Sequence, residues 1–171
     1  MRNNKNSRWA TEIVSLQKEN GAWGYFHSLS NPSKNNRITT EHALRRLQIL
    51  GYTINDAPIL NAVSYMQDCL SGMKAIPDRR EKLHDWDIFT ALMLSTWIRR
   101  FTKDDKIANS VAQKWAEIIS RTFENGVYNN NLYVDTYQKI HGLTPRGGRL
   151  VDLVSFIRFL FLLIFLMIKQ H

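Results

Sequence analysis

The chain has 171 residues, of which 44% are hydrophobic, 22% are charged and one is a cysteine. This composition suits a single folded domain and excludes an intrinsically disordered chain. One cysteine excludes an internal disulfide, and no apolar leader segment opens the sequence, so we expect a cytoplasmic protein.

The net charge of +8 raises the question of nucleic-acid binding. The basic residues are spread along the whole sequence, and their tightest clusters are the pairs 45–46, 79–80 and 99–100, all Arg-Arg. Each pair can be solvated on a helix face or in a loop, so the charge does not form a stripe that follows phosphates. We therefore expect a solvated surface and no nucleic-acid partner.

Three amphipathic helices are predicted in the first half of the chain, because apolar residues recur there at spacings of three and four. Thr39 or Thr40 is the predicted N-cap of the second helix, and Asp56 is the predicted N-cap of the third. The helices are expected over residues 9–17, 39–50 and 57–71, and a loop rich in Asn and Gly is expected over residues 20–38.

Three more helices are predicted in the second half. The first has almost no polar face, which is typical of a helix at the centre of a domain. Asp104 is the predicted N-cap of the next helix, which Gly126 ends, and Gly142 ends the last one. These helices are expected over residues 85–101, 105–125 and 132–140, and no alternating strand pattern occurs, so the fold class is all-α.

Two blocks of sequence recur at the same offset of 105 residues. Residues 12–15 (EIVS) recur as residues 117–120 (EIIS), and residues 19–23 (ENGAW) recur as residues 124–128 (ENGVY). A weaker copy lies about halfway between them, over residues 63–72. A period of about 50 residues with two helices in each period predicts stacked helical hairpins, none of which buries its apolar face alone.

Residues 17–23 (QKENGAW) consist of a Gln, a short spacer, a Gly, one further residue and a Trp. This pattern resembles the QW repeat of squalene-hopene-type terpenoid cyclases, whose α/α-toroid fold is shared with protein prenyltransferase β subunits. In degraded form the resemblance extends over residues 8–142. It implies antiparallel helical hairpins that form an open arc of an α/α toroid, because the chain holds roughly three hairpins and a complete toroid needs about six.

In that family the repeat supports structure and performs no chemistry. Its Gln caps backbone groups at a helix end and packs against the Trp. The resemblance therefore implies a structural role for Gln17, Gly21 and Trp23, and for Gly126 and Tyr128 of the second full copy.

Every second predicted helix would line the inside of such an array, and each of these helices begins near an acidic residue. Glu41, Asp87 and Asp135 lie 46 and 48 residues apart, which is close to one repeat each. Two interpretations remain open: each acid complements the dipole of its own helix, or the acids surround one pocket. In the second interpretation the candidate catalytic residues are Asp85, Asp87, Glu41 and Asp135, and the candidate substrate-binding residues are His84, Trp86, His42, Tyr133 and Tyr137.

The sequence contains neither the complete catalytic motif of the terpenoid cyclases nor the complete zinc site of the prenyltransferases. A hopene-type cyclase protonates an alkene through an Asp, any residue, Asp, Asp motif, whereas Asp85 to Asp87 is followed by Ile88. The zinc site of the prenyltransferases needs an Asp and a Cys with one residue between them, whereas Cys69 directly follows Asp68. We therefore predict no metal and no cofactor, and interpret Cys69 as a small buried apolar residue.

Three classes of function remain open at this point. The cup of the array binds a small isoprenoid, or it binds a carbohydrate that paired carboxylates process, or the array is a non-catalytic scaffold for a protein partner. An apolar aromatic cavity would favour the isoprenoid, converging carboxylates would favour the carbohydrate, and a shallow exposed groove would favour the scaffold.

The end of the chain differs from the rest, because residues 156–168 are apolar except for Arg158. We divide the chain into a helical-repeat region, residues 1–148, and this C-terminal segment, residues 149–171. A membrane span needs about 20 largely apolar residues, which the segment does not supply without interruption. A tail anchor, a helix buried against the fold and an anomalous end all remain open, and we expect membrane association or self-association through this segment.

Overall fold

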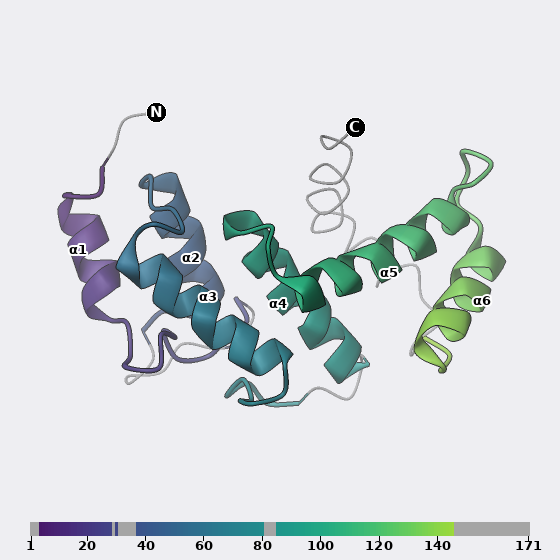
Figure 1. The fold of residues 1–171 in the computed structure, drawn as a ribbon, viewed down its shortest axis with the longest axis horizontal. Helices are drawn as coiled ribbons and strands as arrows, with labels where there is room; N and C mark the ends of the chain where they lie inside the picture. Colours follow the sequence, from purple (N-terminus) through teal and green to yellow (C-terminus); the bar gives the residue numbers. More distant parts are fainter. Residues whose placement is uncertain (1–3, 29, 31–36, 81–84, 146–171) are drawn as a thin grey trace. The chain divides into compact units, whose positions relative to one another are not determined.

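A computed structural model describes residues 4–28, 30, 37–80 and 85–145. Over these residues the chain forms six α-helices and no strand, which confirms the prediction of an all-α fold (Figure 1). The chain divides into two compact units. The first comprises residues 1–79 and 97–103, and the second comprises residues 80–96 and 104–171.

The first unit contains α1 (Arg8–Ser15), α2 (Thr40–Ile49) and α3 (Ala57–Leu70). Ser7 caps α1, and Thr39 caps α2 by accepting a hydrogen bond from the backbone N–H of His42, which confirms the predicted cap. Pro58 lies in the first turn of α3, where its missing N–H has no helical partner to lose. The largest fully buried side chains of this unit are those of Trp23, Phe26, Leu44, Leu47, Ile59, Met66, Trp97 and Ile98.

The long connection between α1 and α2 is anchored on the start of α2. The backbone N–H groups of Thr40 and Glu41, which have no partner within the helix, donate to the carbonyls of Tyr25 and Phe26. Asp78 holds the same stretch from the other side, because its carboxylate accepts hydrogen bonds from two backbone N–H groups and from Ser30 Oγ. The connection therefore has a defined path over its described residues.

The second unit contains the hairpin of α5 (Lys106–Thr122) and α6 (Asn130–His141), which pack against each other. Asn129 caps α6, and Gly142 ends it with a positive φ of 73°. The core of this unit is formed by Leu92, Ala112, Trp115, Ile118, Tyr133 and Tyr137.

Helix α4 (Trp86–Phe101) contributes to both units, since its residues up to Thr96 belong to the second and the remainder to the first. Every residue from Leu92 to Arg99 is buried, as the missing polar face predicts. The pair Arg99-Arg100 is therefore not the solvated surface pair that we expected from the sequence. Arg99 is buried, and the Arg100 guanidinium lies 4.8 Å from the centre of the Trp97 ring.

One predicted N-cap is wrong, and another is in the predicted place without the predicted hydrogen bond. The side chain that caps α5 belongs to Asp105 and not to Asp104, and it accepts a hydrogen bond from the Ala108 N–H at 2.7 Å. Asp56 is the N-cap residue of α3, as predicted, but its side chain makes no capping hydrogen bond. Its carboxylate instead accepts from the Thr53 N–H and from Lys5 Nζ, and the bond to the ammonium group is the stronger, charge-assisted one.

No helix among the described residues is long and apolar enough to cross a membrane. The apolar segment 149–171, on which the expected membrane association and self-association rest, lies outside the described residues.

Candidate functional site

The Gln17 side chain connects the end of α1 to the start of α3. Its amide nitrogen Nε2 donates to the carbonyl of Gly21 and to the carbonyl of Pro58, both at 2.8 Å. Pro58 lies in the first turn of α3, 41 residues further along the chain. The two protons of one amide group thus close the loop after α1 and attach it to a second helix.

Trp23 lies beneath this connection and is 1% exposed. Its indole N–H donates to the Ile13 carbonyl at 2.7 Å, in the last turn of α1, and its backbone N–H donates to Thr40 Oγ1 at 3.1 Å, in the first turn of α2. A buried indole N–H without an acceptor would cost free energy, so the bond to Ile13 fixes the position of the ring. The backbone bond to Thr40 fixes the chain at the start of α2. Trp23 therefore supports the packing of α1 on α2.

Gly21 permits the close approach of this loop to α3. Its φ is +88°, and a Cβ at this position would lie 2.4 Å from the Asn61 carbonyl oxygen. Any side chain would need both a strained backbone and a shift of α3. We refer to the arrangement of Gln17, Gly21 and Trp23 as the repeat joint.

The second copy keeps part of this geometry. The Gly126 N–H donates to the Phe123 carbonyl as the Gly21 N–H donates to the Lys18 carbonyl, and both glycines have a positive φ. Thr122 stands where the first copy has Gln17, and its hydroxyl donates to the Ile118 carbonyl of its own helix. Helix α5 continues to Thr122, whereas α1 already ends at the position that corresponds to Ser120.

Tyr128 takes the place of Trp23 in the second copy. Its ring packs edge-on against Phe123 at 5.8 Å, and its hydroxyl donates to Asn130 Oδ1 at 3.1 Å. It thus joins the end of α5 to the first turn of α6, as Trp23 joins α1 to α2.

Glu41 is the buried acid of the first unit, and its side chain is 3% exposed. One carboxylate oxygen accepts from the Trp97 indole N–H at 2.7 Å, and the other accepts from the Ser28 N–H at 2.7 Å and lies 3.8 Å from His27 Nδ1. Burial alone would raise the pKa of this carboxyl, but the nearby His27 and the hydrogen bonds from Ser28 and Trp97 outweigh it and leave the pKa below its ordinary value. Glu41 is thus held ionised by partners from two other parts of the chain.

Among the candidate site residues, the structure brings Asp85 to Tyr137, since the Tyr137 hydroxyl donates to Asp85 Oδ2 at 2.9 Å. Tyr137 is itself a core residue, with its ring 6.0 Å from Trp115 and 5.9 Å from Tyr133. The His141 ring lies 4.6 Å from Tyr137. Burial and the nearby Lys114 lower the pKa of His141, and Asp85 opposes them.

The remaining candidate residues are more exposed. Asp87 forms an ion pair with Arg80 at 2.7 Å, with 78% of its side chain exposed, and Asp135 is exposed on α6. Trp86 is half-buried and packs against Phe89 on its own helix, at 6.0 Å. His42 is half-buried on α2, and His84 lies outside the described residues.

The expected substrate-binding aromatics Tyr133 and Tyr137 are buried among other side chains, so their rings are not open platforms for a ligand. Glu41 belongs to the first unit, and the other three acids belong to the second. In the described part of the chain, no group of His, Cys, Asp and Glu side chains is arranged to hold a metal ion. Cys69 is half-buried, and burial raises the pKa of its thiol.

Sequence reasoning missed the partners of these acids. His27, Asp78 and Trp97 form the hydrogen bonds that organise the first unit, but their partners lie up to 56 residues away in the sequence. The sequence identifies Trp97 only as an apolar residue of a central helix. No local pattern distinguishes Asp78 from other acidic residues in loops.

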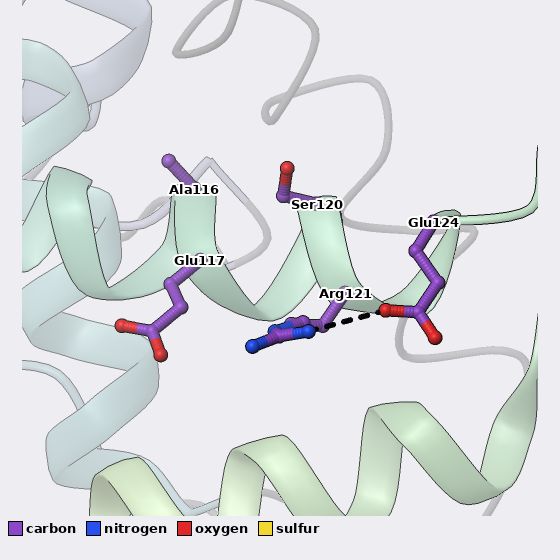
Figure 2. A pocket seen from close by; sticks show the side chains of 5 residues that line it. All are labelled: Ala116, Glu117, Ser120, Arg121 and Glu124. Atoms are coloured by element: carbon purple, nitrogen blue, oxygen red, sulfur yellow. Dashed lines mark hydrogen bonds and ion pairs between the residues drawn. The ribbon is translucent and has the colours of Figure 1, made fainter.

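An open hollow lies along the polar side of α5, lined by Ala116, Glu117, Ser120, Arg121 and Glu124 (Figure 2). The Arg121 guanidinium lies between the two carboxylates and is paired with Glu124 at 3.3 Å. Three of the corresponding positions of the first copy, Thr11, Glu12 and Ser15, are exposed on α1. This side of the helix is therefore a solvated face in both copies of the repeat.

Comparison with protein-family models, with curated proteins and with solved structures found no match to this chain.

Proposed function

We propose that the chain is a non-catalytic scaffold, built from helical hairpins on the plan of the terpenoid-cyclase and prenyltransferase toroids, that binds a protein partner. The observation that carries this proposal is the engagement of two of the four candidate catalytic residues, Glu41 and Asp85, in internal contacts. Glu41 is bound by Trp97 and Ser28, and Asp85 is bound by Tyr137. A general acid or base must reach a substrate, which these contacts oppose.

The repeat joint supports the architectural part of the proposal. Gln17 bonds two carbonyls at a helix end and Trp23 is buried against the same helix end. The resemblance to the QW repeat implies a structural role for both residues, and these contacts support it. The open arc of an α/α toroid stays part of the proposal.

A partner surface is available at one end of the first unit. The Asn4 N–H donates to the Leu50 carbonyl, and Lys5 binds Asp56, so the start of α1 lies beside the end of α2 and the start of α3. Trp9, Ile49 and Leu60 lie at this end and are 73%, 71% and 54% exposed. We call these three residues the hairpin-end surface. An exposed Trp with aliphatic neighbours is typical of a protein interface.

The proposal is tested by capture of a partner with the tagged full chain from an extract of its own source, followed by binding measurements with the purified partner. We expect Trp9→Ser to weaken binding at least tenfold, since anchor aromatics contribute about 2 kcal/mol or more. Arg8→Ser, on the same exposed turn, is the matched control and should bind as the wild type does. Equal binding by Trp9→Ser and the wild type would contradict the proposal.

A further inference from the structure

Three arginine side chains from two helices lie toward the end of the first unit at which α2 ends. Arg45 and Arg46 are exposed in the second half of α2, and Arg100 lies in the last turn of α4. The hydrogen bond between Glu41 and the Trp97 indole joins these two helices. Arg45 lies one turn after this contact on α2, and Arg100 lies one turn after it on α4. We call Arg45, Arg46 and Arg100 the arginine cluster.

The contact between Arg100 and Trp97 holds one member of the cluster in place. The Arg100 guanidinium lies 4.8 Å from the centre of the Trp97 ring, and this ring is itself fully buried and bonded to Glu41. The half-buried Arg100 side chain is therefore held before any partner binds. A side chain that is already held loses less conformational entropy on binding than a free one.

The cluster carries a positive charge that the described part of the chain does not balance. Among the described residues, none of the three arginines is paired with a carboxylate. Burial and the charge of Arg45 lower the pKa of Arg100, so the two like charges lie near each other. Asp56, at the start of α3, is already bound to Lys5 at 2.7 Å. A last-turn arginine complements the dipole of its own helix, but that role does not require arginines of two helices to approach each other.

The arginine cluster borders the hairpin-end surface. Ile49 belongs to that surface, follows Arg45 by one turn of α2 and is 71% exposed. Aromatic residues and Arg are enriched in protein interfaces, and a guanidinium can bind a carboxylate through two parallel hydrogen bonds. A complementary partner therefore presents acidic side chains beside apolar ones.

We propose that the arginine cluster binds acidic side chains of a protein segment whose apolar side chains contact the hairpin-end surface. This inference rests on the proposed scaffold function and names the chemistry of the partner, an acidic amphipathic segment. Its carboxylates would offset the repulsion between Arg45 and Arg100. A phosphate backbone is followed by a stripe of cations, and an anionic lipid surface is bound by about four to eight basic residues, whereas this cluster is small and has apolar neighbours.

A synthetic peptide tests the proposal on the full chain. The probe is an amphipathic peptide of about 15 residues with Glu on one face and Leu on the other, long enough to form a helix. Fluorescence anisotropy of the labelled peptide measures binding. We expect saturable binding that Arg45→Glu and Arg46→Glu each weaken at least fivefold, because each variant replaces an attraction by a repulsion. The same peptide with Lys in place of Glu should not bind.

Lys139→Glu is the matched control. Lys139, like Arg46, is an exposed cation in the last turn of its helix, so both variants change the net charge and the helix end in the same way. Lys139→Glu should bind the peptide as the wild type does. Equal weakening by Lys139→Glu and Arg46→Glu would overturn the inference, and so would a wild type that does not bind the peptide.

Further arms of the experiment test the alternatives. A single-stranded oligonucleotide, or vesicles that contain phosphatidylserine, would overturn the inference if the wild type bound them more tightly than the peptide and Arg46→Glu abolished that binding.

Trp9→Ser, measured with the same peptide, separates the inference from the proposed function. Weaker binding by Trp9→Ser and unchanged binding by the arginine variants would contradict the inference and leave the scaffold function standing. The reverse result would support the arginine cluster and contradict the hairpin-end surface.

Discussion

Trp23 contributes more to the first unit than any exposed aromatic of the chain, because its buried ring also donates an indole hydrogen bond to α1. We expect Trp23→Ala to lower the free energy of unfolding by about 3–5 kcal/mol, as is typical of a buried Trp. Trp9→Ala, at a side chain that is 73% exposed, should change it by less than about 0.5 kcal/mol. Urea denaturation of both variants measures the difference, and equal stabilities would remove the structural role of Trp23.

At Gly21, both the backbone conformation and the packing against α3 exclude a side chain. Gly21→Ala strains a residue with a φ of +88° and also places a methyl group 2.4 Å from the Asn61 carbonyl oxygen. The matched control is Gly72→Ala, because Gly72 has a φ of +81° and no described atom within 4 Å of its Cβ position.

We therefore expect Gly72→Ala to cost only the strain of the left-handed backbone, about 1–2 kcal/mol. Gly21→Ala should cost about 1–3 kcal/mol more, the range for overpacking a close contact. The difference between the two melting curves isolates the contact with α3, and identical curves would mean that α3 does not approach Gly21.

Glu41 makes the stability of the first unit depend on pH. Its folded pKa is depressed, so its contribution is fully present above the pKa of an unfolded glutamate, about 4.3, and is lost as pH falls through the lower folded value. Glu41→Gln removes the charge and turns an amide N–H₂ toward the Ser28 or Trp97 donor, which should cost about 1–3 kcal/mol at neutral pH.

The measurement is the free energy of unfolding between pH 3 and pH 7. We expect the difference in the free energy of unfolding between the wild type and Glu41→Gln to become smaller as the pH falls. Asp135→Asn, at an exposed acid of α6, serves as the control and should leave the pH dependence close to that of the wild type. If this difference stayed the same from pH 7 to pH 3, Glu41 would not be held ionised.

At the scale of helices, Gln17 is the side chain that couples two elements. Gln17→Ala removes both hydrogen bonds from the amide group, to Gly21 and to Pro58, and should lower the free energy of unfolding by about 1–3 kcal/mol. Gln113→Ala, at an exposed glutamine of α5, should have little effect. Hydrogen exchange at the start of α3 should rise in the first variant only, and a rise in both or in neither would contradict the coupling.

The helices themselves were predictable, because the spacing of apolar residues and the cap residues are local signals. All six occur within a few residues of their predicted bounds. The choice between Asp104 and Asp105 as the cap of α5 was not predictable, since both acids precede the helix and backbone geometry decides between them. The role of Asp56 depended on Lys5, which is distant in the sequence.

At the scale of the whole molecule, the repeat predicted two equivalent helix ends, and the structure gives both a glycine with a positive φ. The environment of the acids was not predictable. Glu41 is hydrogen-bonded to Trp97, and Asp85 to Tyr137, in each case across more than 50 residues of sequence. The residues near each partner in the sequence do not indicate either pairing. From the sequence, acids at the starts of helices are therefore equally compatible with a catalytic cluster and with structural hydrogen-bond acceptors.

The central claim is that Glu41 and Asp85 support structure and that the acids at the helix starts do not form a ligand-processing site. Isothermal titration of the full chain with farnesyl diphosphate tests it most directly, because an isoprenoid is the ligand that the resemblance to the toroid enzymes would imply. We predict no saturable heat, for the wild type and for Asp87→Asn alike. Saturable binding by the wild type that Asp87→Asn abolishes would contradict the account.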